Sequence, residues 1–285
     1  MKVSYLGPTG TYTEEALLLS SAGIELELEP RATIFDAVDA VERGDVSRGF
    51  VPFENSIEGS VRATLDAIAF DTSHVQIVGE FDHPIRHNLI AGRERRLDEI
   101  TVVLSHPQAN AQCARFIREQ LPEAEVRSIA STSDAVRRVG LSDQPWAALG
   151  SAAASRAYGC VVLSERVEDV ADNVTRFVWL SGGDYLPTHA ADGGAWRTTL
   201  VFSELGGDRP GALVDALTEF SKRDVNLVRI ESRPLRRGLG RYLFFIDIEG
   251  DVSSGVTAEA VEALRSKAET VRILGSYPLA ATAPL

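Results

Sequence analysis

The sequence predicts a two-lobed α/β body followed by a smaller α+β domain, and three features of the chain support this. Up to about residue 180, short apolar runs alternate with segments of helical period, and a polar loop follows each strand. Residues 181–195 are rich in glycine and small polar residues and have no apolar periodicity. Beyond them, strands and helices follow in a different order.

The first region repeats one unit, which is a strand, a polar loop and a helix. Strands are expected near 3–6, 49–53, 100–104, 126–130, 146–149 and 174–180. Helices are expected near 13–22, 34–41 and 60–70, then one ending before Pro122, one reaching Val139 and one following Ser151. Repetition of this unit predicts an α/β body with mostly parallel sheets. The length suggests two lobes around a cleft, as in periplasmic-binding-protein folds.

Capping residues support the first two helices. Thr11 and Glu14 have the spacing of a capping box, and Thr33 and Asp36 repeat it. Gly44 is a suitable C-terminal stop for the second helix.

The second region has the order β-α-β-β-α-β, which is the ferredoxin-like arrangement. Its elements are expected at 196–203, 211–223, 225–232, 240–248, 257–269 and 271–276. We therefore divide the chain into a body (1–182), a linker (183–195), a C-terminal domain (196–276) and a tail (277–285).

Composition narrows the possible functions. The formal net charge is −12, which argues against nonspecific nucleic-acid binding because that needs a basic surface. No stretch approaches the roughly 20 apolar residues of a membrane span, and the start of the chain is too short an apolar run for a signal peptide. Cys113 and Cys160 lack metal-ligand spacing and suggest a reduced, cytoplasmic protein. The five histidines form no metal motif, so we expect no metal.

Several loops of the body share one chemistry. Each follows a strand, precedes a helix and carries hydroxyl, amide or glycine residues, among them Thr11, Ser56, Ser105, Thr132 and Ser151. Ligands of open α/β sheets bind beyond the carboxyl ends of strands, and helix N-termini bind anions without cationic side chains. Capping alone explains any one loop, but together the loops favour an anion-binding cleft.

Two segments are ambiguous when their residues are considered alone. Gln108 and Gln112 lie four residues apart, on one helix face, and could enter the cleft or face solvent. His106 could be a proton shuttle or simply a helix cap. In 173–180, strand alternation puts Thr175 and Phe177 on one face. On its residues alone, an ordinary strand with a surface arginine is the favoured interpretation of that segment.

The order of the motifs resembles the prephenate dehydratase family. The matching segments are Gly7–Thr13, Val51–Gly59, Ser105–Gln112 and Asn173–Phe177, the last carrying Thr-Arg-Phe. Residues 206–234, with Gly211-Ala212-Leu213 and Glu231-Ser232-Arg233-Pro234, resemble the ACT regulatory domain attached to this family.

The resemblance implies conversion of prephenate to phenylpyruvate, with loss of water and carbon dioxide, in phenylalanine biosynthesis. Aromatisation drives such a step, so no cofactor is expected. The resemblance places Thr175 at the departing hydroxyl. The implied catalytic residues are Thr175, Asn55, Gln112, Ser105 and Arg176, and the implied substrate-binding residues are Thr11, Ser56, His106, Thr132 and Phe177. A threonine hydroxyl is a very poor acid, so we expect Thr175 to orient the leaving group, with part of the proton supplied by water or a nearby group.

The resemblance further implies that phenylalanine is an allosteric effector. The implied effector residues are Gly211, Ala212, Leu213, Asn226, Glu231, Ser232 and Arg233. Val228 stands where the family often has a hydroxyl residue, and Arg233 could instead form a surface ion pair with Glu231. Such domains usually pair side by side, which predicts a homodimer or homotetramer.

Two other interpretations stay open. Arogenate could be the substrate, or the chain could be a noncatalytic amino-acid-binding regulator. A chorismate mutase activity is not expected, since no further helical segment precedes residue 1 or follows residue 285.

Overall fold

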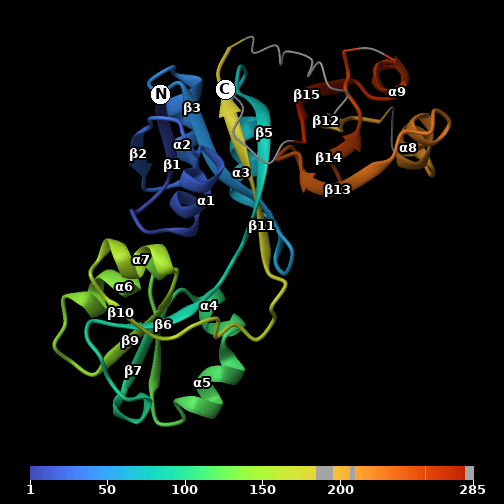
Figure 1. The fold of residues 1–285 in the computed structure, drawn as a ribbon. Coiled ribbons are helices and arrows are strands. Elements are labelled where there is room, and N and C mark those ends of the chain that lie inside the picture. Colours follow the sequence, from blue (N-terminus) through green and yellow to red (C-terminus); the bar gives the residue numbers. More distant parts are fainter. Residues whose placement is uncertain (184–194, 206–208, 254, 280–285) are drawn as a thin grey trace. The chain divides into compact units, whose positions relative to one another are not determined.

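The computed structural model describes residues 1–183, 195–205, 209–253 and 255–279. These residues form two compact units. The first comprises Met1–Ala37, Phe50–Thr64 and Asp82–Phe177, and the second comprises Val38–Gly49, Leu65–Phe81 and the described residues from Val178 onward. Figure 1 shows the elements in chain order.

The first sheet has the order β2-β1-β3-β11-β5, with β4 paired to β3. Its strands are β1 (Lys2–Leu6), β2 (Glu27–Arg31), β3 (Arg48–Asn55), β4 (Gly59–Ser60), β5 (Gln76–Pro84) and β11 (Val174–Ser181). Its helices are α1 (Tyr12–Ser20), α2 (Ile34–Glu42) and α3 (Arg62–Phe70). Strand β11 comes from late in the body yet lies between β3 and β5, so the Asn55 end of β3 and the Thr175 end of β11 are neighbours.

The second sheet has the order β10-β6-β9-β7-β8. Its strands are β6 (Asn88–Ala91), β7 (Val102–Ser105), β8 (Glu125–Ser128), β9 (Trp146–Gly150) and β10 (Val161–Ser164). Its helices are η1 (Leu97–Glu99), α4 (Pro107–Gln112), α5 (Ala114–Gln120), α6 (Thr132–Gly140) and α7 (Ala152–Ala157). Strand β6 is antiparallel to β9 and β10, whereas β7 is parallel to β8 and β9.

Alternation along β7 sorts the helices onto the two faces of this sheet. Val103 packs in a cluster with Cys113 and Ile117 of the α4–α5 segment. Its neighbours Val102 and Leu104 pack in a separate cluster with α6. The helix expected to end before Pro122 is two helices that meet at Cys113.

The chain enters the second sheet after β5 and returns to the first with β11. The predicted two-lobed α/β body is thereby confirmed, with sheets that are mixed. Strands β2, β4, β5, β6 and β10 and the short helix η1 were not among the expected elements. No helix in the described ranges is long and apolar enough to cross a membrane.

The C-terminal domain has the predicted order, β12-α8-β13-β14-α9-β15. Its elements are β12 (Trp196–Ser203), α8 (Ala212–Ser221), β13 (Leu227–Pro234), β14 (Tyr242–Glu249), α9 (Gly255–Arg265) and β15 (Thr270–Pro278). The sheet order is β13-β14-β12-β15, and Leu200, Phe202 and Ile246 pack with the helices in one core. Strand β15 passes the predicted end at 276. Residues 184–194 of the predicted linker and 280–285 of the predicted tail lie outside the described residues.

The opposite face of this sheet contacts Leu65–Phe81 within the same unit. Arg197 lies 2.6 Å from both carboxylate oxygens of Glu80. Arg272 donates to the carbonyl oxygens of Ile68 and Thr72, at 3.1 and 2.7 Å, at the C-terminal end of α3. The bond to Ile68 reaches a carbonyl in the last turn of α3, where a helix end leaves carbonyls without an intrahelical partner, and the bond to Thr72 holds the loop that follows.

Candidate functional site

A cavity of about 1080 Å³ lies in the first compact unit. Just over half of the lining residues are threonine, serine, asparagine, glutamine, histidine or proline. The lining includes Gly7, Pro8, Thr9, Thr11, Tyr12, Thr13, Asn55, His87, His106, Gln108, Gln112, Ser131, Thr132, Asn173, Thr175 and Phe177. A pocket of this size accommodates a small organic acid.

The first turns of α1, α4 and α6 contribute to this lining. Thr11 caps α1 by accepting from the Glu14 N–H at 3.3 Å. Glu14 completes the expected capping box differently, because its carboxylate accepts from the Gly10 N–H rather than from that of Thr11. His106 Nδ1 caps α4, and Ser131 caps α6. Helix starts present N–H groups to a ligand, so the cavity suits carboxylates.

The two arginines in the lining, Arg31 and Arg137, each have a carboxylate partner. Arg31 lies 2.5 Å from Glu29, and Arg137 lies 2.6 Å from Asp134. Burial disfavours the charge on Asp134, but hydrogen bonds and the charges of Arg137 and Arg138 outweigh it and lower the pKa of Asp134. Because both arginines are already paired with carboxylates, the helix starts are the donors of the cavity that are best suited to an anion.

Asn55 and Thr175 are joined across adjacent strands. Asn55 Nδ2 donates to Thr175 Oγ1 at 2.9 Å, and both residues are 8% exposed. Asn55 Oδ1 accepts from the backbone N–H groups of Ile57 and Glu58, each at 3.0 Å. Since Thr175 Oγ1 accepts from Asn55, its own proton is available to an acceptor in the cavity.

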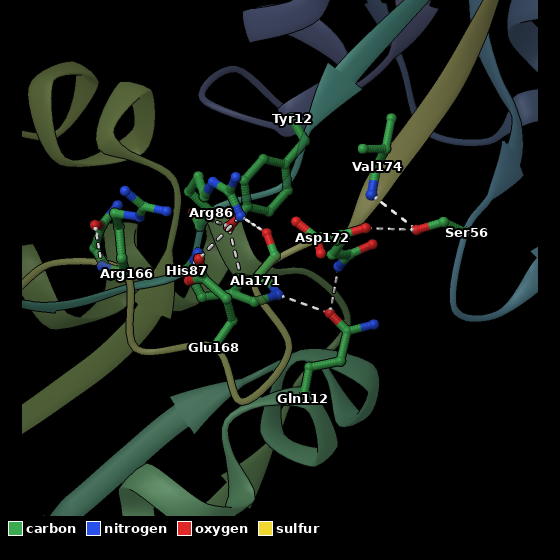
Figure 2. Close-up of polar contacts among 12 residues, drawn as sticks. Tyr12, Ser56, Arg86, His87, Gln112, Arg166, Glu168, Ala171, Asp172 and Val174 are labelled. Atoms are coloured by element: carbon green, nitrogen blue, oxygen red, sulfur yellow. Dashed lines mark hydrogen bonds and ion pairs between the residues drawn. The ribbon is translucent and has the colours of Figure 1, made fainter.

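The network continues from Asn55 to the second lobe. Asn55 Nδ2 also donates to Asn173 Oδ1 at 2.7 Å, and Asn173 Nδ2 donates to Gln112 Oε1 at 2.9 Å. His87 Nε2 lies 2.9 Å from the same Gln112 oxygen. Figure 2 shows Gln112 pointing from its helix toward this cluster.

The structure brings most of the predicted site residues together. The cavity lining includes the catalytic candidates Thr175, Asn55 and Gln112 and the substrate-binding candidates Thr11, His106, Thr132 and Phe177. Gln108 also lines it, as does the Thr175–Phe177 face expected from strand alternation.

Ser56, Ser105 and Arg176 are not among the lining residues. Ser105 is fully buried and donates to Leu149 O at 3.0 Å, which ties β7 to β9. Ser56 donates to Asp172 O and accepts from the Val174 N–H, so it holds the strand start. These contacts indicate structural support of the site.

Arg176 points away from the Thr175 face, as alternation requires. It forms an ion pair with Glu54 at 2.8 Å, and its guanidinium lies 4.9 Å from the ring centre of Phe53. These contacts place Arg176 on the face of β11 opposite Thr175.

Tyr12, His87 and Asn173 line the cavity but were not among the predicted site residues. His87 stands next to Asn88 at the start of a short apolar strand, where a lone histidine gives no functional signal. Tyr12 and Asn173 lie within the matching segments Gly7–Thr13 and Asn173–Phe177, so the positions of these two residues could have indicated them.

The predicted effector residues lie in the second unit. Gly211 precedes α8 with φ of +87°, a left-handed conformation that favours glycine. Pairing with β14 puts Ser232 opposite Phe244 of the core, whereas Glu231 and Arg233 belong to the other face of β13. Arg233 pairs with Asp66 at 2.7 Å, not with Glu231 as a surface pair would require.

Comparison with known proteins agrees with this geometry. Residues 3–184 match the family model described as prephenate dehydratase, and residues 199–266 match the ACT domain. A prephenate dehydratase of Lactococcus lactis subsp. cremoris is 37% identical over 283 residues, which is 97% of each chain. A bifunctional chorismate mutase/prephenate dehydratase of Aquifex aeolicus is 36% identical over 98% of this chain and 74% of the relative.

A solved structure is also similar to this chain along its whole length. It is a prephenate dehydratase from Arthrobacter aurescens in complex with L-Phe, 36% identical to this chain, with a TM-score of 0.89. The alignment covers 100% of this chain and 92% of that one. The chain therefore belongs to the prephenate dehydratase family and carries a C-terminal ACT domain.

Proposed function

We propose that this chain is a lyase that converts prephenate to phenylpyruvate, water and carbon dioxide in phenylalanine biosynthesis. The bond between the ring and its hydroxyl breaks as the ring carboxylate leaves as carbon dioxide. The electron pair of the broken carbon–carbon bond enters the ring, which becomes aromatic. The departing oxygen takes up a proton and leaves as water.

The observation that carries this proposal is the direction of the Asn55–Thr175 hydrogen bond. A hydroxyl that accepts from an amide N–H keeps its own proton for another acceptor. The same bond stabilises negative charge on Oγ1, so it makes a weak acid somewhat stronger. Thr175 is therefore suited to hydrogen-bond the leaving hydroxyl, while water or a nearby group supplies part of the proton.

The remaining lining residues would hold the substrate. The carboxylates suit the N-terminal turns of α1, α4 and α6 at Thr11, His106 and Thr132. Phe177 offers an apolar surface to the ring, and Gln112 offers an amide. Fixing a dicarboxylate in this way positions the reacting hydroxyl at Thr175.

Phenylpyruvate formation from prephenate by the purified chain tests the activity, with absorbance in alkali as the measurement. T175A should lower kcat by roughly 100-fold to 1000-fold, the usual loss for a group that stabilises developing charge. T175S retains a hydroxyl and should keep much of the rate. Wild-type turnover by T175A would reject the assignment of Thr175.

Two alternatives are distinguished by related assays. Arogenate carries an amino group in place of the keto oxygen, so competition between the two substrates in one reaction measures the preference. A noncatalytic amino-acid-binding regulator would bind ligand without forming phenylpyruvate.

The proposed organisation has residues 1–182 as the catalytic body and 196–276 as the regulatory domain, in a cytoplasmic protein. L-Phenylalanine is the proposed effector, since the Arthrobacter aurescens protein was solved with L-Phe. Gly211, Ala212 and Leu213 at the start of α8 could offer N–H groups to its carboxylate. The other effector candidates are Asn226, Glu231, Ser232 and Arg233. A rate that does not respond to phenylalanine would reject this regulation.

Assembly as a homodimer or homotetramer is part of the same proposal. Strand β13 is the first strand of the sheet order, and it exposes Val228 and Ile230. An exposed apolar edge strand favours pairing with a second copy.

A further inference from the structure

The hydrogen bonds around Gln112 have a direction that can be deduced from the backbone. The N–H groups of Ile57 and Glu58 can only donate, so the Asn55 atom that they contact at 3.0 Å must be the oxygen. The Asn55 amide nitrogen then faces Asn173, at 2.7 Å, and Thr175. This assignment does not depend on the choice of side-chain amide orientation.

The orientation of Asn55 fixes the orientations of Asn173, Gln112 and His87 in turn. Asn173 must present its oxygen to Asn55, so its nitrogen donates to Gln112 at 2.9 Å. Gln112 must therefore present its oxygen to Asn173. The His87 Nε2 atom lies 2.9 Å from that oxygen, so Nε2 must carry a proton.

The other nitrogen of His87 meets a hydroxyl. Tyr12 Oη lies 2.8 Å from His87 Nδ1 and 2.9 Å from the Arg86 carbonyl oxygen. Burial lowers the pKa of His87, against the opposing effects of the Gln112 bond and the Glu168 charge. Burial also raises the pKa of Tyr12, so the phenol remains a donor. The bond to Gln112 fixes a proton on Nε2, whereas the single phenol proton of Tyr12 has two acceptors, the Arg86 carbonyl oxygen and the unprotonated Nδ1 of a neutral imidazole.

These bonds leave one group without a partner. The Gln112 oxygen receives both available donors, whereas the Gln112 nitrogen is buried and has no hydrogen-bond partner among the described residues. Figure 2 shows two dashed lines at the Gln112 oxygen. Rotating the amide by half a turn would place its NH2 group against the NH2 group of Asn173, so Asn173 fixes the orientation and the His87 N–H holds the same oxygen from a second side.

We propose that His87 is a positioning residue of the dehydratase reaction, which fixes the Gln112 carboxamide so that its NH2 group is offered to an oxygen of the bound substrate. The inference rests on the proposed function, because it assigns a purpose to the unpaired NH2 group of a residue that lines the cavity. His87 acts through Gln112 and need not touch the substrate. The amide links also make it unsuited to relay a proton to Thr175.

The two nitrogens of His87 can be tested separately. The amide nitrogen of glutamine can take the place of Nε2, whereas the shorter asparagine reaches only the Nδ1 side. H87Q should therefore retain kcat/KM within a few-fold, while H87N and H87L should lose roughly 10-fold to 100-fold, less than a direct contact with the reacting atoms. H83Q is the matched control, since His83 is also buried but does not line the cavity.

A double-mutant cycle separates positioning from a merely structural role. If His87 acts through Gln112, H87L should cost little further activity in a Q112A background. Equal losses for H87Q and H87N, or additive losses of H87L and Q112A, would overturn the inference. A wild-type chain that does not consume prephenate would instead overturn the proposed function.

Discussion

At the scale of single residues, the site is organised by which group donates each hydrogen bond. Two backbone N–H groups orient Asn55, and the Asn55 amide then sets the roles of Thr175 and Asn173. Thr175 looks like an ordinary strand residue in the sequence. In the structure its hydroxyl accepts from Asn55, so its proton is left for an acceptor in the cavity. The sequence could indicate Thr175 by motif, but the direction of its proton depends on Ile57 and Glu58, more than a hundred residues earlier.

Buried His87 predicts a pH dependence of stability. Its pKa is lowered from the ordinary 6.5 in the folded chain, so the unfolded chain binds the proton more readily just below that pH. The stability is present above pH 6.5 and is lost as the pH falls through the folded pKa, by about 1.4 kcal/mol for each pKa unit of difference.

Urea unfolding of wild type and H87Q between about pH 7.5 and about pH 5.5 measures this contribution. Wild type should lose more stability than H87Q over that range, because glutamine does not titrate. An equal loss in both proteins would contradict the account of His87.

At the scale of elements, the contact between β15 and β5 depends on a glycine. A Cβ atom at Gly275 would lie 2.1 Å from the Ile77 carbonyl oxygen, a backbone atom that cannot move aside independently. G275A should lower the free energy of unfolding by about 1–3 kcal/mol, the usual cost of overpacking. Urea unfolding measures it, with T270A on the exposed start of β15 as control. Equal urea midpoints for G275A and T270A would show that β15 leaves room for a side chain between Gly275 and the Ile77 carbonyl oxygen.

The sequence predicted elements better than it predicted their contacts. Caps and apolar periodicity located α1, α6 and the whole β-α-β-β-α-β order, because these signals are local. Strands β6 and β10 have only four residues each, too few for a clear alternation. The packing of β5 on the C-terminal sheet joins residues about 200 apart, as in the Tyr277–Glu80 bond, and leaves no local pattern.

At the scale of the whole molecule, a net charge of −12 opposes the binding of a dicarboxylate substrate by long-range repulsion. The lining of the cavity provides hydrogen-bond donors that do not require a positive net charge. Helix starts supply N–H donors, and Asn55, Gln112 and Thr175 supply neutral polar groups. An acidic surface and an anion-binding site can therefore coexist in one chain.

The proposed self-association through β13 predicts that a charge at an exposed position of this edge strand disrupts assembly. Ile230 is 47% exposed on this strand. I230K should shift the protein toward monomer in light scattering, since an edge lysine opposes strand pairing. V256K, on a helix residue that is 56% exposed, is the control. An unchanged mass for I230K would place the contact between subunits elsewhere.

The central claim is that Asn55 directs the Thr175 proton into the cavity, and the kcat of N55D with prephenate tests it most directly. Aspartate can still accept from the Ile57 and Glu58 N–H groups, but it cannot donate to Thr175. N55D should therefore lower kcat by roughly 100-fold, and adding N55D to T175A should cost little more. Wild-type turnover by N55D would contradict the claim.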